Sequence, residues 1–69
     1  MEYPTRLTIK IKEGAGGYWR WIAYDQDGVY RCHSRPLDNE FAAIEDSNMV
    51  VQGVREARWV DKDGNDLEV

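Results

Sequence analysis

The dipeptide Asp27-Gly28, with aromatic and β-branched residues on both sides of it, is the feature that most constrains how this chain can fold. Asp and Gly tolerate the positive φ angles of a type I′ turn, so this dipeptide between two strand-like segments indicates a β-hairpin. We predict one strand from about Tyr18 to Asp25. A second strand should end before Pro36, because proline has no N–H to donate to a sheet ladder.

A two-residue turn also fixes which residues lie opposite one another. The partners expected, counted outward from the turn, are Gln26–Val29, Asp25–Tyr30, Tyr24–Arg31, Ala23–Cys32, Ile22–His33 and Trp21–Ser34. Side chains alternate along a strand, so one face should hold Trp19, Trp21, Ala23, Tyr30 and Cys32. The other face should hold Tyr18, Arg20, Ile22, Tyr24, Arg31 and His33. The first set is the more apolar and is expected to face the core, although a register slip of one residue would change these pairs.

Alternation before the hairpin predicts another strand. Leu7, Ile9 and Ile11 point one way from Thr5 onward, and polar residues lie between them. The glycine-rich segment 14–17 should connect this strand to the next.

A helix and a further strand are expected after the hairpin. Asp38 is the expected N-cap of a helix from Asn39 to about Val51. One helical face should carry Phe41, Ile44, Ser47/Asn48 and Val51, which recur at spacings of three and four. The segment 55–61 predicts a strand with Ala57 and Trp59 directed inward, and the alternation at 66–69 leaves a short fifth strand open.

The order of elements is therefore β-β-β-α-β, with an optional fifth strand. Three hairpin-linked strands followed by one helix predict a single small α+β domain over residues 1–69. We expect an antiparallel sheet with the helix packed on one face.

Composition narrows the classes of function. The formal net charge of −4 disfavours non-specific binding to nucleic acid, which depends on clustered Lys and Arg. A single Cys cannot form an internal disulfide, and one Cys with one His cannot build a structural zinc site. No segment resembles a signal peptide or a membrane span. We expect a cytoplasmic protein without metal or cofactor.

The segment from Tyr18 to Val51 resembles the YegP-like family of small bacterial proteins. The matching residues are Trp19-Arg20-Trp21-Ile22, Asp27-Gly28, Cys32-His33-Ser34 and Ala42-Ala43-Ile44-Glu45. Residues 46–51 and the segment around Trp59 depart from the family pattern. The resemblance implies a small α+β fold, with dimerisation as an option, and it assigns no catalytic residue.

Residues that could carry catalysis do not form a recognisable site. Cys32 and His33 are neighbours in one strand and should point to opposite faces, so they cannot act as a nucleophile–base pair. The loops beginning at Asp25 and Asp61 lack the spacing of calcium ligands. We expect no enzymatic activity.

The aromatic and basic face of the hairpin remains as the candidate binding surface: Tyr18, Arg20, Tyr24, Arg31 and His33. Tyr and Arg are enriched where proteins bind one another, so we expect a non-catalytic protein-binding module, with self-association included. Single-stranded nucleic acid is an alternative, because rings can stack on bases while Arg contacts phosphate. A small acidic inhibitor encoded by a mobile element is a further alternative. A solvated sheet face without function is the simplest reading of the same residues.

Overall fold

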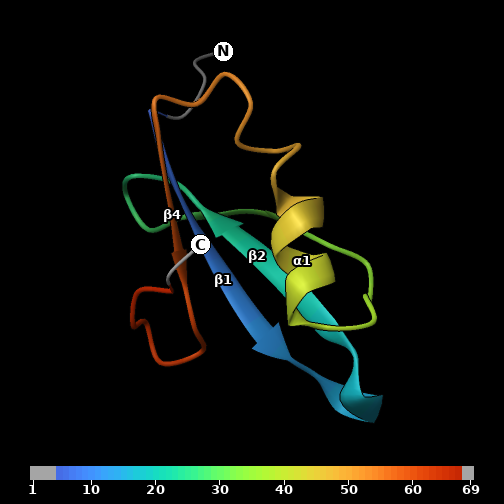
Figure 1. Ribbon diagram of the computed structural model, residues 1–69. Coiled ribbons are helices and arrows are strands. Elements are labelled where there is room, and N and C mark those ends of the chain that lie inside the picture. The colour runs from blue at the N-terminus through green and yellow to red at the C-terminus, as the bar shows by residue number, and fades with distance from the viewer. Residues whose placement is uncertain (1–4, 68–69) are drawn as a thin grey trace.

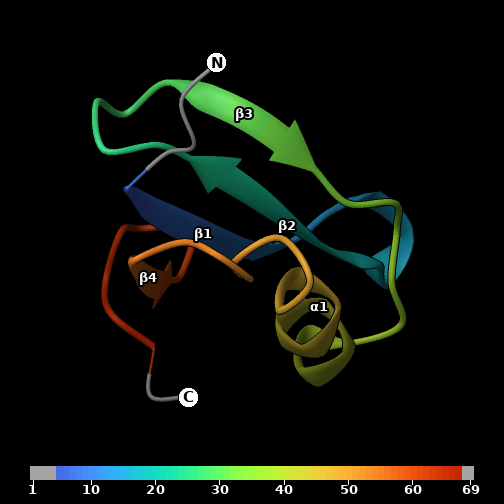
Figure 2. The same ribbon diagram turned by 90° about the horizontal axis from the view of Figure 1, so that it is seen from above.

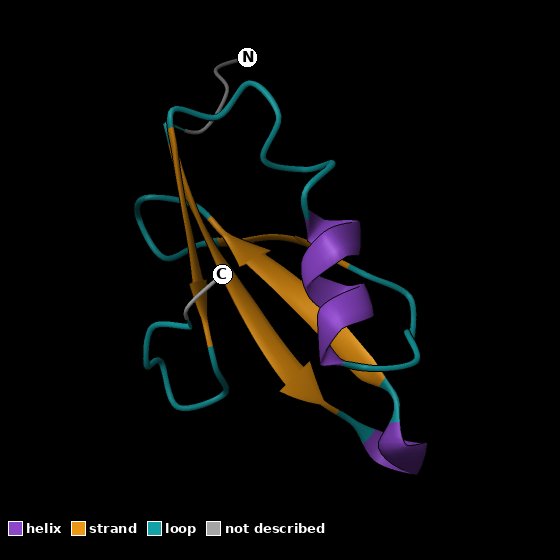
Figure 3. Cartoon of the chain, in the orientation of Figure 1, coloured by secondary structure: helices purple, strands orange, loops and turns teal. Residues whose placement is uncertain are grey.

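The computed structural model describes residues 5–67 as a four-stranded sheet with one α-helix on one of its faces (Figure 1). The elements are β1 (Arg6–Glu13), a short 3-10 helix η1 (Ala15–Gly17), β2 (Trp19–Tyr24), β3 (Tyr30–His33), α1 (Glu40–Ser47) and β4 (Glu56–Val60). The predicted α+β class and the order of its first five elements are confirmed (Figure 3).

The strands lie in the order β3-β2-β1-β4, and the sheet is mixed. β2 runs antiparallel to both β1 and β3, whereas β4 pairs with β1 in parallel. The expectation of a purely antiparallel sheet is therefore wrong at one strand pair. A parallel neighbour needs a crossover connection, and the segment that contains α1 provides it by returning the chain so that β4 starts in the direction of β1.

Alternation along β1 places its apolar residues between the sheet and α1. Leu7, Ile9 and Ile11 are buried, as predicted, and Trp21 and Ala23 of β2 are buried on the same face. Figure 2 shows the helix on this side of the sheet and no helix on the other. The core is thus a single layer between one face of the sheet and one helix.

Helix α1 is shorter than predicted. On the predicted face Ser47 is buried and Ile44 and Val51 pack against the core, but Phe41 does not. Asn39, and not Asp38, is the N-cap, and its side-chain oxygen accepts a hydrogen bond from the N–H of Ala42 at 2.7 Å. Ala43 and Ser47 are the buried residues of the helix, whereas Phe41 is 69% exposed. The prediction that Phe41 faces the core is wrong.

Two indole rings on the sheet explain why small helix residues face inward. The Nε1–H of Trp21 donates to the Asp46 carboxylate at 2.8 Å, and the Nε1–H of Trp59 donates to the Ser47 hydroxyl at 2.8 Å. The rings need space between sheet and helix, and their donors need acceptors on the helix. Large apolar side chains at these helix positions would supply neither.

The hairpin turn differs from the predicted type I′ turn. Only Gly28 has a positive φ there, and no non-glycine residue in the described range does. The N–H of Gly28 donates to the carbonyl of Asp25 at 3.0 Å, and the N–H of Asp25 donates to the carbonyl of Val29 at 3.0 Å. The loop therefore contains three residues, and Asp25 pairs with Val29 in place of Tyr30.

A β-bulge corrects this shift of register farther from the turn. Tyr24 lies opposite Tyr30, but Ala23 lies opposite Cys32, so Arg31 is the extra residue. The predicted pairs Ala23–Cys32 and Ile22–His33 are confirmed. The predicted pair Tyr24–Arg31 is wrong, and so is the expectation that Tyr30 faces the core, since Tyr30 is 52% exposed.

The C-terminal strand lies within its predicted range. In β4, Ala57 and Trp59 are half-buried beside Leu7 and Ile9, as expected. After β4, Asp66 forms an isolated bridge with Val60, and residues 5–67 contain no fifth strand. Residues 68–69 of the optional strand lie outside the described range. Within that range, no helix is both long enough and apolar enough to cross a membrane.

Candidate functional site

The sheet face opposite α1, here called the open face, carries aromatic and basic side chains. Side chains alternate along β1, and Leu7, Ile9 and Ile11 are buried under the helix. The residues between and after them, Thr8, Lys10 and Lys12, therefore lie on the open face. Its members on the three strands β1 to β3 are Thr8, Lys10, Lys12, Arg20, Ile22, Tyr24, Tyr30 and His33. Arg58 of β4 lies beside Thr8 and extends the same face.

Two positive charges lie directly opposite one another at one end of the open face. Lys12 and Arg20 are register partners on β1 and β2, and both are exposed. Like charges at directly opposed positions destabilise an antiparallel pair. Within residues 5–67, neither side chain forms an ion pair with a carboxylate. In this part of the chain, no ion pair offsets the repulsion between the two side chains.

The other basic residues on this side of the sheet have partners. Arg58 forms an ion pair with Asp66 at 2.7 Å, and Arg6 forms one with Glu56 at 2.9 Å. The ammonium of Lys10 lies 5.5 Å from the centroid of the Tyr24 ring, a cation–π geometry. Lys12 and Arg20 thus differ from the cations around them.

Aromatic rings and an aliphatic floor adjoin the Lys12–Arg20 pair. A shallow hollow is lined by Lys12, Arg20, Ile22, Tyr24, Tyr30 and His33. The hydroxyl of Tyr30 is hydrogen-bonded to Nδ1 of His33, and their ring centroids lie 5.9 Å apart. The hollow therefore has positive charge at one end and rings at the other, with Ile22 among them.

The structure brings together three of the five residues predicted from the sequence: Arg20, Tyr24 and His33. Arg31 is the bulged residue, and its guanidinium lies 3.5 Å from the carboxylate of Asp25. It does not line the hollow. Tyr18 is 51% exposed and precedes β2. Its ring lies against the turn at Gly16, where an added Cβ would come within 3.3 Å of it.

Sequence reasoning missed Lys10, Lys12 and Tyr30 as members of the open face. The two lysines alternate with the buried residues of β1, and that pattern is visible in the sequence. The sequence pattern does not show that β1 lies beside β2 in the sheet. Tyr30 was assigned to the wrong face because the predicted turn was one residue too short.

The residues most often used in nucleophilic catalysis are kept apart. Cys32 lies opposite Ala23 on the helix side of the sheet, and His33 lies opposite Ile22 on the open face. Burial raises the pKa of the Cys32 thiol, and the nearby Arg31 charge lowers it by less. A raised pKa disfavours the reactive thiolate.

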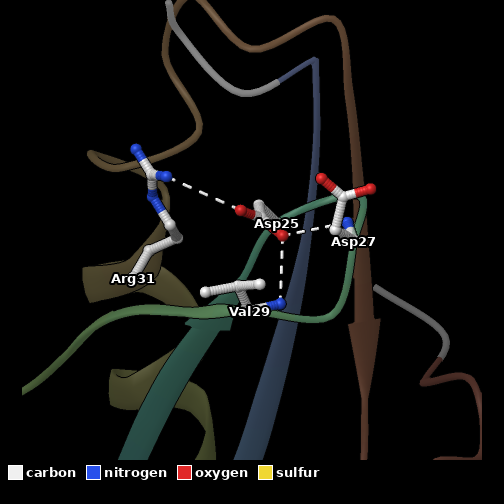
Figure 4. A network of polar contacts seen from close by, with 4 residues as sticks. All are labelled: Asp25, Asp27, Val29 and Arg31. Carbon is white, nitrogen blue, oxygen red and sulfur yellow. Dashed lines mark hydrogen bonds and ion pairs between the residues drawn. The ribbon is translucent and has the colours of Figure 1, made fainter. Parts of the chain in front are cut away.

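The carboxylates of the two aspartate–glycine turns serve the backbone. Asp25 Oδ1 accepts hydrogen bonds from the N–H groups of Asp27 at 2.9 Å and Val29 at 3.0 Å (Figure 4). Asp61 Oδ1 accepts the equivalent bonds from Asp63 and Asn65 at 2.8 and 3.0 Å. The bond from Asn65, followed by that from Asp63, lowers the pKa of Asp61. Residues 5–67 contain no cluster of metal-ligating side chains.

Comparison with protein-family models, with curated proteins and with solved structures finds no match for this chain. The resemblance to the YegP-like family remains a prediction. The geometry of the open face is therefore the basis for a functional proposal.

Proposed function

We propose that this protein is a non-catalytic binding module that contacts another protein through its open face. The observation that carries the proposal is the opposed Lys12–Arg20 pair, which has no ion-pair partner within the described chain. An anionic group of a bound partner would offset the repulsion between them. The protein as a whole has a net charge of −4, so the Lys12–Arg20 pair is a local positive site on an acidic protein.

The neighbouring side chains suit a protein partner. Tyr24, Tyr30 and Arg20 are of the residue types that contribute most binding energy at protein interfaces. They come from adjacent strands, so the sheet holds their backbone positions at fixed spacing and little backbone freedom is lost on binding. The separation of Cys32 from His33 supports the view that binding, and not catalysis, is the task of this chain.

Affinity capture with immobilised protein tests the proposal. The baits are wild type, the double variant Lys12→Glu with Arg20→Glu, and the control Arg55→Glu with Lys62→Glu. The control changes the net charge by the same amount at exposed residues that do not line the hollow of Lys12 and Arg20. We expect a set of proteins from the source cells to be retained by wild type and control and lost from the open-face variant. Equal retention by all three baits would show that the open face is not the binding surface.

Single-stranded nucleic acid is a second candidate, because Tyr24 and Tyr30 are cross-strand partners in the hollow that Lys12 and Arg20 also line. Successive bases stack on rings placed in this way. Nuclease treatment of the captured material separates the two candidates: loss of retention after treatment would favour nucleic acid. Light scattering of the purified protein shows whether a second copy is the partner.

A further inference from the structure

We infer that the open face binds an acidic protein segment in which a large apolar side chain lies next to carboxylates. This inference rests on the proposed function and names the chemistry of the partner. Three observations carry it: two opposed cations without an ion-pair partner in residues 5–67, an apolar floor beside them, and the net charge of −4, which disfavours a long polyanion.

The charge requirement comes from Lys12 and Arg20. Each is exposed and can donate to an oxygen, and the guanidinium offers a planar fork that fits a carboxylate in two-point contact. Because they are register partners, one carboxylate can lie between both cations, and two adjacent carboxylates can neutralise both charges. A neutral segment would leave the repulsion in place.

The apolar requirement comes from the centre of the hollow. Ile22 is half-buried between Lys10 and His33 in the cross-strand row, so a large aliphatic side chain is presented on a face that no helix covers. Tyr24 and Tyr30 lie opposite each other in the next row. An aliphatic or aromatic side chain of the partner placed here would remove this surface from water. Its position next to the charges requires carboxylates close by in the partner sequence.

Nucleic acid fits the same face less well. The Lys10 ammonium already lies over the Tyr24 ring, so a base would have to displace it or use the Tyr30 ring alone. Two unpaired cations neutralise few phosphates, and the affinity of single strands for a protein depends on the number neutralised. A strand longer than the hollow would also meet the acidic remainder of a protein whose net charge is −4. A short acidic segment avoids this.

The test is a titration of the isotopically labelled protein followed by backbone amide resonances. The probes are a short peptide of Glu-Glu-Leu repeats, its Gln-Gln-Leu counterpart, a Glu-Glu-Ser counterpart, and oligo-dT. We expect the Glu-Glu-Leu peptide to shift resonances of β1, β2 and β3 around Lys12, Ile22 and Tyr30. Both counterparts should bind at least about fivefold more weakly, because each lacks one half of the recognition.

Matched variants assign the effect to the face. Lys12→Glu with Arg20→Glu should weaken binding of the Glu-Glu-Leu peptide about tenfold or more, whereas the control pair Arg55→Glu and Lys62→Glu should weaken it less than about threefold. Equal weakening by both pairs would mean that the net charge of the protein, and not the Lys12–Arg20 pair, controls binding of the peptide, and the inference would be wrong.

The remaining outcomes separate this inference from the proposed function. If no peptide shifts the open-face resonances but affinity capture still depends on Lys12 and Arg20, only the acidic–apolar chemistry is overturned. If oligo-dT alone shifts them, nucleic acid replaces a protein partner and both statements fall. Equal binding of the Glu-Glu-Leu and Glu-Glu-Ser peptides would overturn the apolar requirement.

Discussion

A single carboxylate organises each of the two aspartate–glycine turns. Asp25 and Asp61 each accept two backbone N–H groups, from the residues two and four positions later. In both turns the glycine takes the positive φ, 78° at Gly28 and 85° at Gly64. The segments 25–29 and 61–65 share the pattern Asp-x-Asp-Gly, so one local rule explains both. Asp25 has the additional contact with Arg31.

Replacing Asp25 should therefore destabilise the protein more than replacing Asp27. Asp25→Ala leaves two N–H groups and one guanidinium without their acceptor at a site that is 9% exposed. We expect the free energy of unfolding to fall by about 1–3 kcal/mol. Asp27→Ala, at an exposed residue whose backbone N–H remains bonded to Asp25, should change it by less than about 0.5 kcal/mol. Urea denaturation followed by tryptophan fluorescence measures both, and equal losses would contradict this account of the turn.

Lys12 and Arg20 illustrate a residue-scale feature that stability does not explain. Their opposition on β1 and β2 is unfavourable, yet each is typical of a solvated strand when taken alone. The sequence shows both residues but does not show that they lie opposite each other, because that pairing depends on the register set by the η1 connection. Hence the charge pair, which carries the proposed function, was not predictable from local pattern.

At the scale of the element, α1 shows how a sheet can decide which face of a helix is buried. Eight residues are too few for a stable isolated helix, so α1 depends on its tertiary contacts. Those contacts include the Trp21–Asp46 and Trp59–Ser47 hydrogen bonds. Periodicity predicts a buried position for both Phe41 and Ser47, but only Ser47 is buried, because the helix packs with the residues that supply acceptors to the two indoles turned toward the sheet.

Two helix variants test whether Ser47, and not Phe41, packs in the core. Ser47 is fully buried, and Ser47→Ala removes the acceptor of the Trp59 indole, so we expect a loss of about 1–3 kcal/mol of unfolding free energy. Phe41→Ala removes a much larger side chain, but one that is 69% exposed. Apart from the change in helix propensity, we expect it to lower the free energy of unfolding by less than about 0.5 kcal/mol. Thermal denaturation followed by circular dichroism ranks the two variants. A larger loss for Phe41→Ala than for Ser47→Ala would contradict the account that Ser47, and not Phe41, packs in the core.

At the scale of the whole molecule, β4 completes the sheet from the far end of the chain. Its parallel pairing with β1 spans from Arg6–Glu56 to Lys10–Val60, and it makes β1 a central strand. Trp59, beside Ile9, lies on the helix side of the sheet, and Val60, beside Lys10, lies on the open face. The fold therefore depends on a contact between residues about as far apart in sequence as the described chain allows.

Removing β4 should prevent folding of the remainder. A chain that ends at Val54 would expose one edge of β1 and lose the Trp59 ring that packs against the core. Small domains have little stability in reserve, so we expect an unfolded chain. Its amide proton–nitrogen correlation spectrum should show the narrow dispersion of a disordered peptide. A dispersed spectrum like that of the full chain would show that β1, β2, β3 and α1 fold without β4.

The sequence by itself determined the α+β class, the order of elements, the buried side of β1, and the hairpin pairs away from the turn. These depend on period-two alternation, proline and glycine placement, and local turn chemistry, all of which act between near neighbours. Only the tertiary structure decided the parallel β1–β4 pair, the inward face of α1, the side of the sheet on which Tyr30 lies, and the opposition of Lys12 and Arg20. Each of these depends on contacts between segments that are distant in sequence. There, a shift of register by one residue or the need of an indole for an acceptor decides the outcome against the local preference.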